Sequence, residues 1–457
     1  MAADPRPAPS SALFDALSGQ LWGRSPAAWT QPGPDLALSA ADLAAGLHAL
    51  RAQLEDGDSS LVPRIYSGSR PVGFRLDAHL PAPGEGLDAW EARLAAGPGG
   101  PELGMVIEDA QSLGGALWAR AVGVVRQIAA RRGLPAGGCH AELFISNTQR
   151  SFFGVHKDSL ETLTLVVRGR KRFLVWPFAV FADHEAVGDK GPEAQINLPA
   201  DLDLEPYRDQ ATVLEGGPGD VLFWPASHWH VAEAAAPGFV STMTVAFFPS
   251  PARAAGCPFR ITTEAITRFG ADGFSPAWAP YADPGRAGGA AAVAGQLDQT
   301  LRALLADPTV ERARAEFGLS FATGWGFRRV PEEGPPAEID LQDDVITDAD
   351  HPLQWASPDA AGFPMSVHGL VLTTTPPYIP LAAHLNGGGR FSVADLAARF
   401  CGPTLSEDDL LGALSALSAV RYLQVVPAAA QQSAADPGPA APTDGTEDTD
   451  GTEDTDG

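Results

Sequence analysis

The spacing of hydrophobic and polar residues predicts helices at two places in the first third of the chain. Residues 1–58 have the pattern of helical turns broken by proline-rich loops, and the clearest helix follows Ser39, which is a suitable N-cap. Residues 109–134 have the pattern of an amphipathic helix that Gly133 closes. We therefore expect an N-terminal helical segment over 1–58 and a second long helix further along.

The pattern changes over residues 141–250, where short runs of β-branched and aromatic residues are separated by Gly, Pro and Asp. This rhythm is typical of an antiparallel sandwich or barrel. Helical spacing returns over 251–335. Residues 336–430 then form a distinct unit with a terminal strand and two helices that have capping-type starts, at Ser392 and Ser406.

The end of the chain is acidic, and so is the chain as a whole. Residues 431–457 close with TDGTEDTDGTEDTDG, which has no apolar side chain to bury and therefore predicts a disordered acidic tail. The formal net charge is −25, from 56 acidic and 31 basic residues. Nucleic acid is thus not an expected partner, because binding it requires a basic surface, whereas a basic protein or peptide is compatible.

Cysteine usage and hydropathy bear on the cellular compartment in which the protein is expected. The chain has three cysteines, far apart, which suggests a reducing cytoplasm and not a disulfide framework: Cys139, Cys257 and Cys401. No apolar run approaches the roughly 18–20 residues of a membrane helix. The N-terminus also lacks the pattern of a secretory signal. We expect a cytoplasmic protein that does not interact with a membrane.

A histidine and an aspartate lie two residues apart in the β-rich region. On a strand, residues i and i+2 point to the same face, so His156 and Asp158 project together while Lys157 projects away. One more histidine would complete the two-histidine, one-carboxylate set that holds iron(II) and leaves coordination positions open. The competing interpretation is that His156 is an ordinary packed histidine.

The segment GGPGDVLFWPASHWHVAEA, residues 216–234, offers the missing ligand. A glycine-rich turn leads to a short buried strand, then to Pro225, and then to His228 and His230. These two histidines also share a face, so alternation alone allows either of them to reach the metal.

Lys171 follows a strand-length apolar run that starts soon after Asp158. A hairpin return would place it deep beside the same face as the ligands. A buried lysine needs an anionic partner or it loses its charge, and a dicarboxylate co-substrate would supply that partner. The alternative is that Gly-Arg-Lys-Arg is only a basic hairpin turn.

Three motifs together resemble a known family. HKD at 156–158, TLVVRGRKRFLVWP at 164–177 and GDVLFWPASHWHV at 219–231 resemble the JmjC/cupin-like iron(II)- and 2-oxoglutarate-dependent oxygenases, particularly the bacterial protein hydroxylases of that group. The resemblance implies an α+β fold. Its core is a double-stranded β-helix (the jelly roll of cupins and JmjC proteins) over residues 59–250, with flanking helices.

The resemblance also implies roles for individual residues. His156, Asp158 and His230 take the positions of the Fe(II) ligands. Lys171 takes the position of the lysine that pairs with the C5 carboxylate of 2-oxoglutarate, and Thr162 that of a strand residue facing this co-substrate.

His228 stands where the family usually has an aromatic residue. It is therefore interpreted as a residue that contacts the substrate or supports the ligands from behind. The alternative, which alternation leaves open, is that His228 and not His230 is the metal ligand.

The implied function is that of a dioxygenase. The enzyme would hydroxylate a C–H bond of a peptide or protein side chain, consuming O₂ and forming succinate and CO₂. One alternative is a metal-dependent cupin without 2-oxoglutarate, such as an isomerase or dioxygenase, which has no use for Lys171. Another alternative is an N-methyl-lysine demethylase. A non-catalytic binding scaffold is a further alternative, but such a protein would not need all three metal ligands, which this sequence retains.

The C-terminal half resembles the ribosomal oxygenases of this group, although less closely. Residues 336–430 resemble their winged-helix-like domain, for which the balance of charge favours peptide recognition or packing over DNA binding. The helical segment 251–335 resembles a dimerisation segment, so a homodimer is a prediction of the resemblance.

Overall fold

A computed structural model describes residues 11–57, 61–97, 102–135, 137–192, 194–248, 295, 298, 302, 308–327, 329–331, 334–356 and 362–428. The chain divides into two compact units, one of residues 1–333 with 351–376 and the other of residues 334–350 with 377–457. Within the predicted dimerisation segment 251–335, the structure describes only residues 295, 298, 302, 308–327, 329–331 and 334–335. The predicted acidic tail 431–457 lies outside the described residues.

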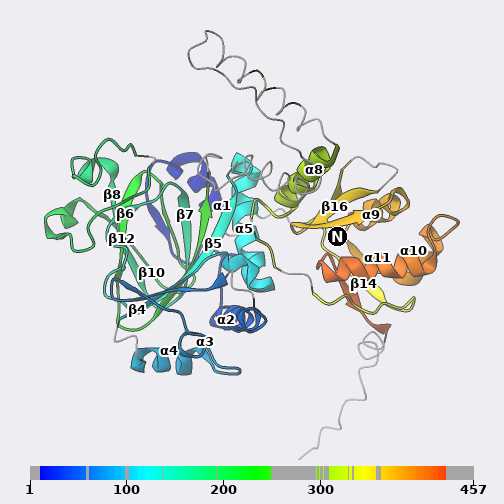
Figure 1. Ribbon diagram of the computed structural model, residues 1–457, viewed down its shortest axis with the longest axis horizontal. Helices are drawn as coiled ribbons and strands as arrows, with labels where there is room; N and C mark the ends of the chain where they lie inside the picture. The colour runs from blue at the N-terminus through cyan, green and yellow to red at the C-terminus, as the bar shows by residue number, and fades with distance from the viewer. Residues whose placement is uncertain are drawn as a thin grey trace, which may run out of the picture. The chain divides into compact units, whose positions relative to one another are not determined.

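Two antiparallel sheets form the centre of the first unit (Figure 1). The larger sheet has the order β1-β11-β7-β13-β5-β4-β2-β3. Its strands are β1 (Ala27–Trp29), β2 (Arg64–Ser67), β3 (Arg70–Val72), β4 (Leu103–Ile107), β5 (Cys139–Ser146), β7 (Glu161–Arg168), β11 (Val221–Trp224) and β13 (Val240–Phe247). The smaller sheet has the order β10-β8-β12-β6-β9. Its strands are β6 (His156–Lys157), β8 (Lys171–Pro177), β9 (Ile196–Asn197), β10 (Thr212–Gly216) and β12 (His228–Ala234).

The order of the strands identifies the architecture. Along the chain, β5, β7, β11 and β13 enter the larger sheet, while β6, β8, β10 and β12 enter the smaller one. This interleaving of two antiparallel sheets is that of a jelly roll. The predicted double-stranded β-helix core is therefore confirmed, and so is the α+β class.

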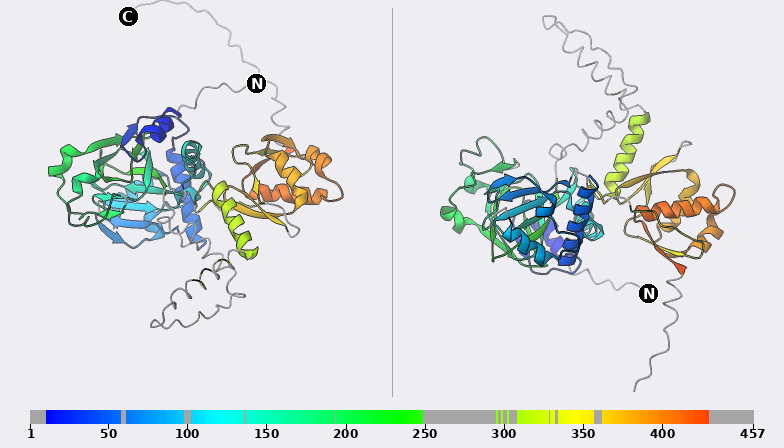
Figure 2. Two further views of the ribbon diagram at one scale, coloured as in Figure 1. Left: turned by 90° about the horizontal axis from the view of Figure 1, so that it is seen from above. Right: turned by 60° about the horizontal axis from the view of Figure 1, so that its bottom comes forward.

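Helices cover the outer face of the larger sheet. They include α2 (Ala40–Glu55), which contacts β7, and α5 (Gly115–Arg132), which contacts β13; the first unit also contains α1 (Ser11–Ala16), α3 (Leu76–His79) and α4 (Leu87–Ala96). A capping box between Ser39 and Asp42 starts α2, as the sequence indicates. Helices α2 and α5 lie side by side (Figure 1 and Figure 2) and bury their apolar faces in one core with β7 and β13. Because this core fixes the larger sheet from outside, the space between the two sheets is left for a site.

A further sheet belongs to the first unit. Its strands have the order β15-β16-β17 and are β15 (Gln354–Trp355), β16 (Phe363–Val367) and β17 (Leu370–Thr374). Helix α8 (Pro308–Thr323) packs against this sheet. Hydrogen bonds from Ser320 Oγ to Gly369 O, at 2.6 Å, and between the hydroxyls of Thr323 and Ser366, at 2.7 Å, join the helix to the sheet. The sequence assigned these strands to the predicted domain 336–430, whereas contacts group them with the first unit.

The second unit combines a small sheet with helices. The sheet has the order β18-β14-β19, and the elements are β14 (Asp344–Thr347), α9 (Ile379–Leu385), β18 (Gly389–Ser392), α10 (Val393–Phe400), α11 (Glu407–Ala419) and β19 (Leu423–Val426). Ser392 and Ser406 cap α10 and α11, each accepting a hydrogen bond from the main chain three residues on. The winged-helix-like assignment stays a prediction. In the part of the chain that the structure describes, none of the helices has the length and apolar character to cross a membrane.

Candidate metal centre

Strand pairing brings two of the predicted ligands together. Strand β6 pairs with β12 through a single register contact, His156 opposite His230. Residues directly opposite each other in an antiparallel pair have their side chains on the same face. The two imidazole rings accordingly lie 4.2 Å apart, centroid to centroid.

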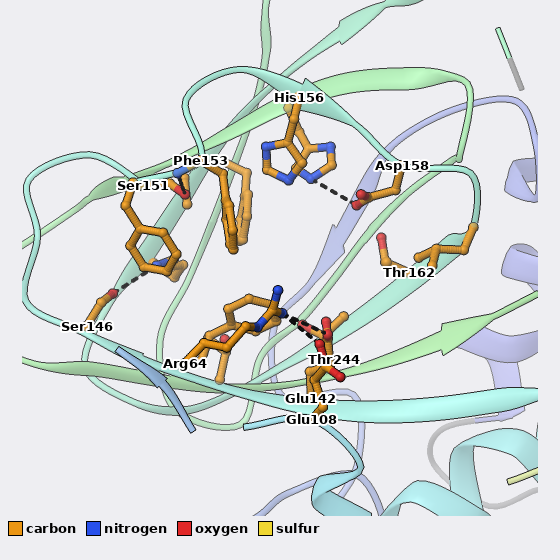
Figure 3. Close-up of a pocket in the computed structure, with 18 of the residues that line it drawn as sticks. Arg64, Glu108, Glu142, Ser146, Ser151, Phe153, His156, Asp158, Thr162 and Thr244 are labelled. Atoms are coloured by element: carbon orange, nitrogen blue, oxygen red, sulfur yellow. Dashed lines mark hydrogen bonds and ion pairs between the residues drawn. The ribbon is translucent and has the colours of Figure 1, made fainter. Parts of the chain in front are cut away.

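Asp158 completes the group. Its Oδ2 lies 3.5 Å from Nε2 of His230, and Figure 3 shows His156 and Asp158 pointing into the same space. One ligand atom from each of His156, Asp158 and His230 can be chosen so that all three lie within 4.8 Å of one another. The structure thus brings together the three residues that the sequence proposed as a set.

The protonation state of the histidines suits metal binding. Nδ1 of His156 lies 3.1 Å from the carbonyl oxygen of Gly154, which can only accept, so Nδ1 carries a hydrogen and Nε2 is the ring atom left to face a metal. Burial, with His156 nearby, holds the pKa of His230 well below its usual range, so this ring is neutral near pH 7. Nδ1 of His230 is buried without a hydrogen-bond partner in the structure. Two imidazoles and one carboxylate fit a first-row divalent metal such as iron(II).

The three candidate ligands face a cavity of about 450 Å³ between the two sheets. Lys171 and Thr162 also line it, from β8 and β7. Nζ of Lys171 lies 3.5 Å from Oγ of Ser146, and burial lowers the pKa of Lys171 to about 8. Oγ1 of Thr162 is buried without a hydrogen-bond partner in the structure. The cavity therefore holds a metal-type donor set and, separately, groups that suit an anion.

His228 is placed differently from His230. It lies opposite Pro177 in β8, beyond the end of the β6 pairing, and it is not among the residues that line the cavity. Its Nδ1 lies 3.1 Å from Oγ of Ser227, and burial lowers the pKa of the ring. The register therefore separates two histidines that alternation alone made equivalent.

One charged wall of the cavity was not predicted. His140 and Glu142 share the inner face of β5, and Arg64 and Glu108 approach from β2 and from the end of β4. Nη2 of Arg64 lies 2.9 Å from Glu108 and 3.9 Å from Glu142, and Figure 3 shows the guanidinium directed toward both carboxylates. Burial raises the pKa of Glu142. The alternation in CHAELFIS was the available signal for His140 and Glu142; nothing local pointed to Arg64 and Glu108.

A stack of aromatic rings closes the side of the cavity next to His156. The rings of Tyr66 and Phe152 stack at 3.9 Å, and Phe153 lies 4.4 Å from Phe152 and 5.5 Å from His156. Phe152 also packs on Gly104, where an added Cβ would lie 2.1 Å from its ring. The absence of a side chain at Gly104 thus allows the stack to form.

We expect Gly104→Ala to displace Phe152 and to lower the free energy of unfolding by about 1–3 kcal/mol, the usual cost of overpacking. Urea unfolding of both proteins measures the change. Gly123→Ala in α5 is the matched control, because a Cβ there meets no atom within 4 Å and alanine favours a helix. Equal stability of Gly104→Ala and the wild type would contradict the prediction.

Residues 118–251 match the family model described as a cupin-like domain. None of the curated proteins matches the sequence. Among solved structures, the chain is similar to Escherichia coli ycfD, at 15% identity over 90% of this chain and 97% of that chain, with a TM-score of 0.48. It is also similar to the same bacterium's YcfD described as a ribosomal oxygenase (14% identity, 91% and 98% coverage, TM-score 0.47). A complex of that protein with cobalt and 2-oxoglutarate gives 15% identity, 90% and 98% coverage and a TM-score of 0.47.

Proposed function

Because residues 118–251 form a cupin-like domain that contains all three clustered residues, we propose that this protein is an Fe(II)- and 2-oxoglutarate-dependent oxygenase. The observation that carries the proposal is the convergence of His156, Asp158 and His230 on one cavity that also holds Lys171. The three clustered residues would hold the iron. A metal-dependent cupin without 2-oxoglutarate would leave the lysine without a role.

The reaction proposed is hydroxylation of a C–H bond. Iron with its co-substrate supplies the oxidative chemistry, in which one atom of O₂ enters the substrate as a hydroxyl and the other enters succinate as 2-oxoglutarate loses CO₂. The ammonium of Lys171 would bind the far carboxylate of 2-oxoglutarate, and the unpartnered hydroxyl of Thr162 would donate to the same molecule.

Aromatic side chains would exclude water from this chemistry. Trp224 lies 4.8 Å from the ring of His230, and Phe173 lies 4.4 Å from Trp224, so the two rings line the cavity beside His230. A dry site strengthens every ion pair and hydrogen bond formed within it.

The charged wall bears on the substrate. Two carboxylates, Glu108 and Glu142, face one guanidinium, that of Arg64, which leaves an excess of negative charge when both are ionised. A peptide or protein substrate that presents a neutral or positively charged side chain fits this wall better than an acidic one.

The test uses the full chain, loaded with Fe(II), and a panel of peptides that differ only in one basic, neutral or acidic residue. We expect bound iron and succinate formation that depends on 2-oxoglutarate and O₂, with a product 16 Da heavier, the mass of one oxygen atom. Release of formaldehyde from methyl-lysine peptides would indicate the demethylase instead. Bound iron without succinate on any peptide would favour the cupin that does not use 2-oxoglutarate.

A further inference from the structure

A buried lysine lies directly behind the candidate metal centre. Lys157 stands between the first two candidate ligands in sequence, and it is 0% exposed. Its Nζ donates hydrogen bonds to the carbonyl oxygens of Pro192 and Ala194, at 2.5 Å each, and reaches the carbonyl oxygen of Ala226 at 3.5 Å. The ammonium of a buried lysine has no water around it and depends on these carbonyl oxygens for its hydrogen bonds. Losing one of these hydrogen bonds is costly, so the side chain stays fixed in this position.

Ala226 is held from a second direction as well. Its N–H donates to Oε2 of Glu161 at 3.2 Å, and Glu161 is only 6% exposed. Lys157 ends β6 and Glu161 begins β7, so the turn that carries Asp158 has one of these buried side chains at each end. Ala226 lies in the turn that leads from β11 into β12, shortly before His230. The two side chains therefore join the turn of one candidate ligand to the turn that precedes another.

The strands alone hold the centre weakly. Strand β6 consists of His156 and Lys157, it meets β12 at one register position, and its other neighbour, β9, also has two residues. Strands in proteins are usually about 5–6 residues long, and so short a strand has few ladder hydrogen bonds to fix its position. Side-chain hydrogen bonds to Ala226 supply a second set of restraints.

We propose that Lys157 and Glu161 are positioning residues of the metal centre: by holding the two polar main-chain atoms of Ala226, they fix Asp158 relative to His230. This inference rests on the proposed function, because it presumes that the cluster binds a metal. Neither residue touches the metal in this arrangement. Glu161 acts through the N–H of Ala226, and Lys157 acts through the carbonyl oxygen of Ala226 together with those of Pro192 and Ala194.

Cobalt(II) binding to the full chain tests the proposal, measured by competition with a chelator and by the visible absorption of the bound ion. We expect Lys157→Met and Glu161→Met each to raise the Kd for Co(II) about tenfold or more, the effect usual for outer-shell partners of metal ligands. Glu161→Gln keeps an oxygen acceptor for Ala226 and is expected to stay within about threefold of the wild type. The double Met variant should bind Co(II) more weakly than either single variant. The increase in its Kd should be smaller than the product of the two single increases, because both side chains act on Ala226.

Val122→Ala, in the core of α5, is the control for a general loss of stability, since Val122 is 1% exposed and belongs to a cluster that does not include Ala226. It should lower the melting temperature of the metal-free protein without changing the Kd for Co(II). The proposal is overturned if folded Lys157→Met and Glu161→Met bind Co(II) as the wild type does, or if Val122→Ala weakens binding as much as they do. Should Lys157→Met not fold, Glu161→Met and Glu161→Gln decide the matter alone. A wild type that binds no Co(II) contradicts the proposed function itself.

Discussion

His230→Ala is expected to abolish iron binding and all turnover, whereas His228→Ala keeps the iron. His230 lies opposite His156 in the β6–β12 pair and has its ring inside the cluster, while His228 lies beyond that pair and outside the cavity lining. Loss of one of three protein ligands should cost more than the roughly 10–100-fold that loss of an outer-shell partner costs. Iron content after desalting and the rate of succinate formation measure both variants.

His228→Ala is the matched control for this experiment, because it removes the same side chain from the same strand two residues away. It should retain a full equivalent of iron, and any change should fall on substrate turnover. The reverse result, iron kept by His230→Ala and lost by His228→Ala, would move the third ligand by two residues without changing the class of enzyme.

Lys171→Met is expected to weaken the binding of 2-oxoglutarate by one to two orders of magnitude and to leave iron content unchanged. A charge-assisted hydrogen bond contributes roughly 1.5–3 kcal/mol, and about 1.4 kcal/mol corresponds to a factor of ten. The methionine keeps the apolar stem and removes only the ammonium. The dependence of succinate formation on 2-oxoglutarate concentration measures the change.

Arg172→Met provides the control on the same strand, since Arg172 is hydrogen-bonded to Glu215 and does not line the cavity. It should leave the affinity for 2-oxoglutarate unaltered. An unchanged affinity in Lys171→Met would remove the reason to assign 2-oxoglutarate to this cavity and would favour a metal cupin that works without it.

The pH dependence of the same binding gives an independent test. Burial lowers the pKa of Lys171 to about 8, so in the free protein the ammonium is charged below that pH and neutral above it. Only the charged form pairs with a carboxylate. The affinity of the wild type for 2-oxoglutarate should therefore fall as the pH rises through about 8, and that fall should be absent in Lys171→Met.

Local patterns in the sequence determined much of this protein. Alternation placed His156 and Asp158 on one face, and the strand-length run before Lys171 placed it at a return toward that face; the structure has both in one cavity. The helix starts at Ser39 and Ser406 could also be predicted from the sequence, because a capping box is formed by residues only three apart. Each of these features depends on neighbours within a few residues.

Tertiary structure alone decided which distant segments meet. The register of β12 against β6 places His230, and not His228, opposite His156, and it pairs two segments that are far apart in the sequence. Arg64 and Glu108 come from β2 and the end of β4, far from the motif, and reach the cavity only because those strands extend the larger sheet. Alternation shows which way a side chain points, and only the pairing of strands from separate parts of the chain shows what it meets.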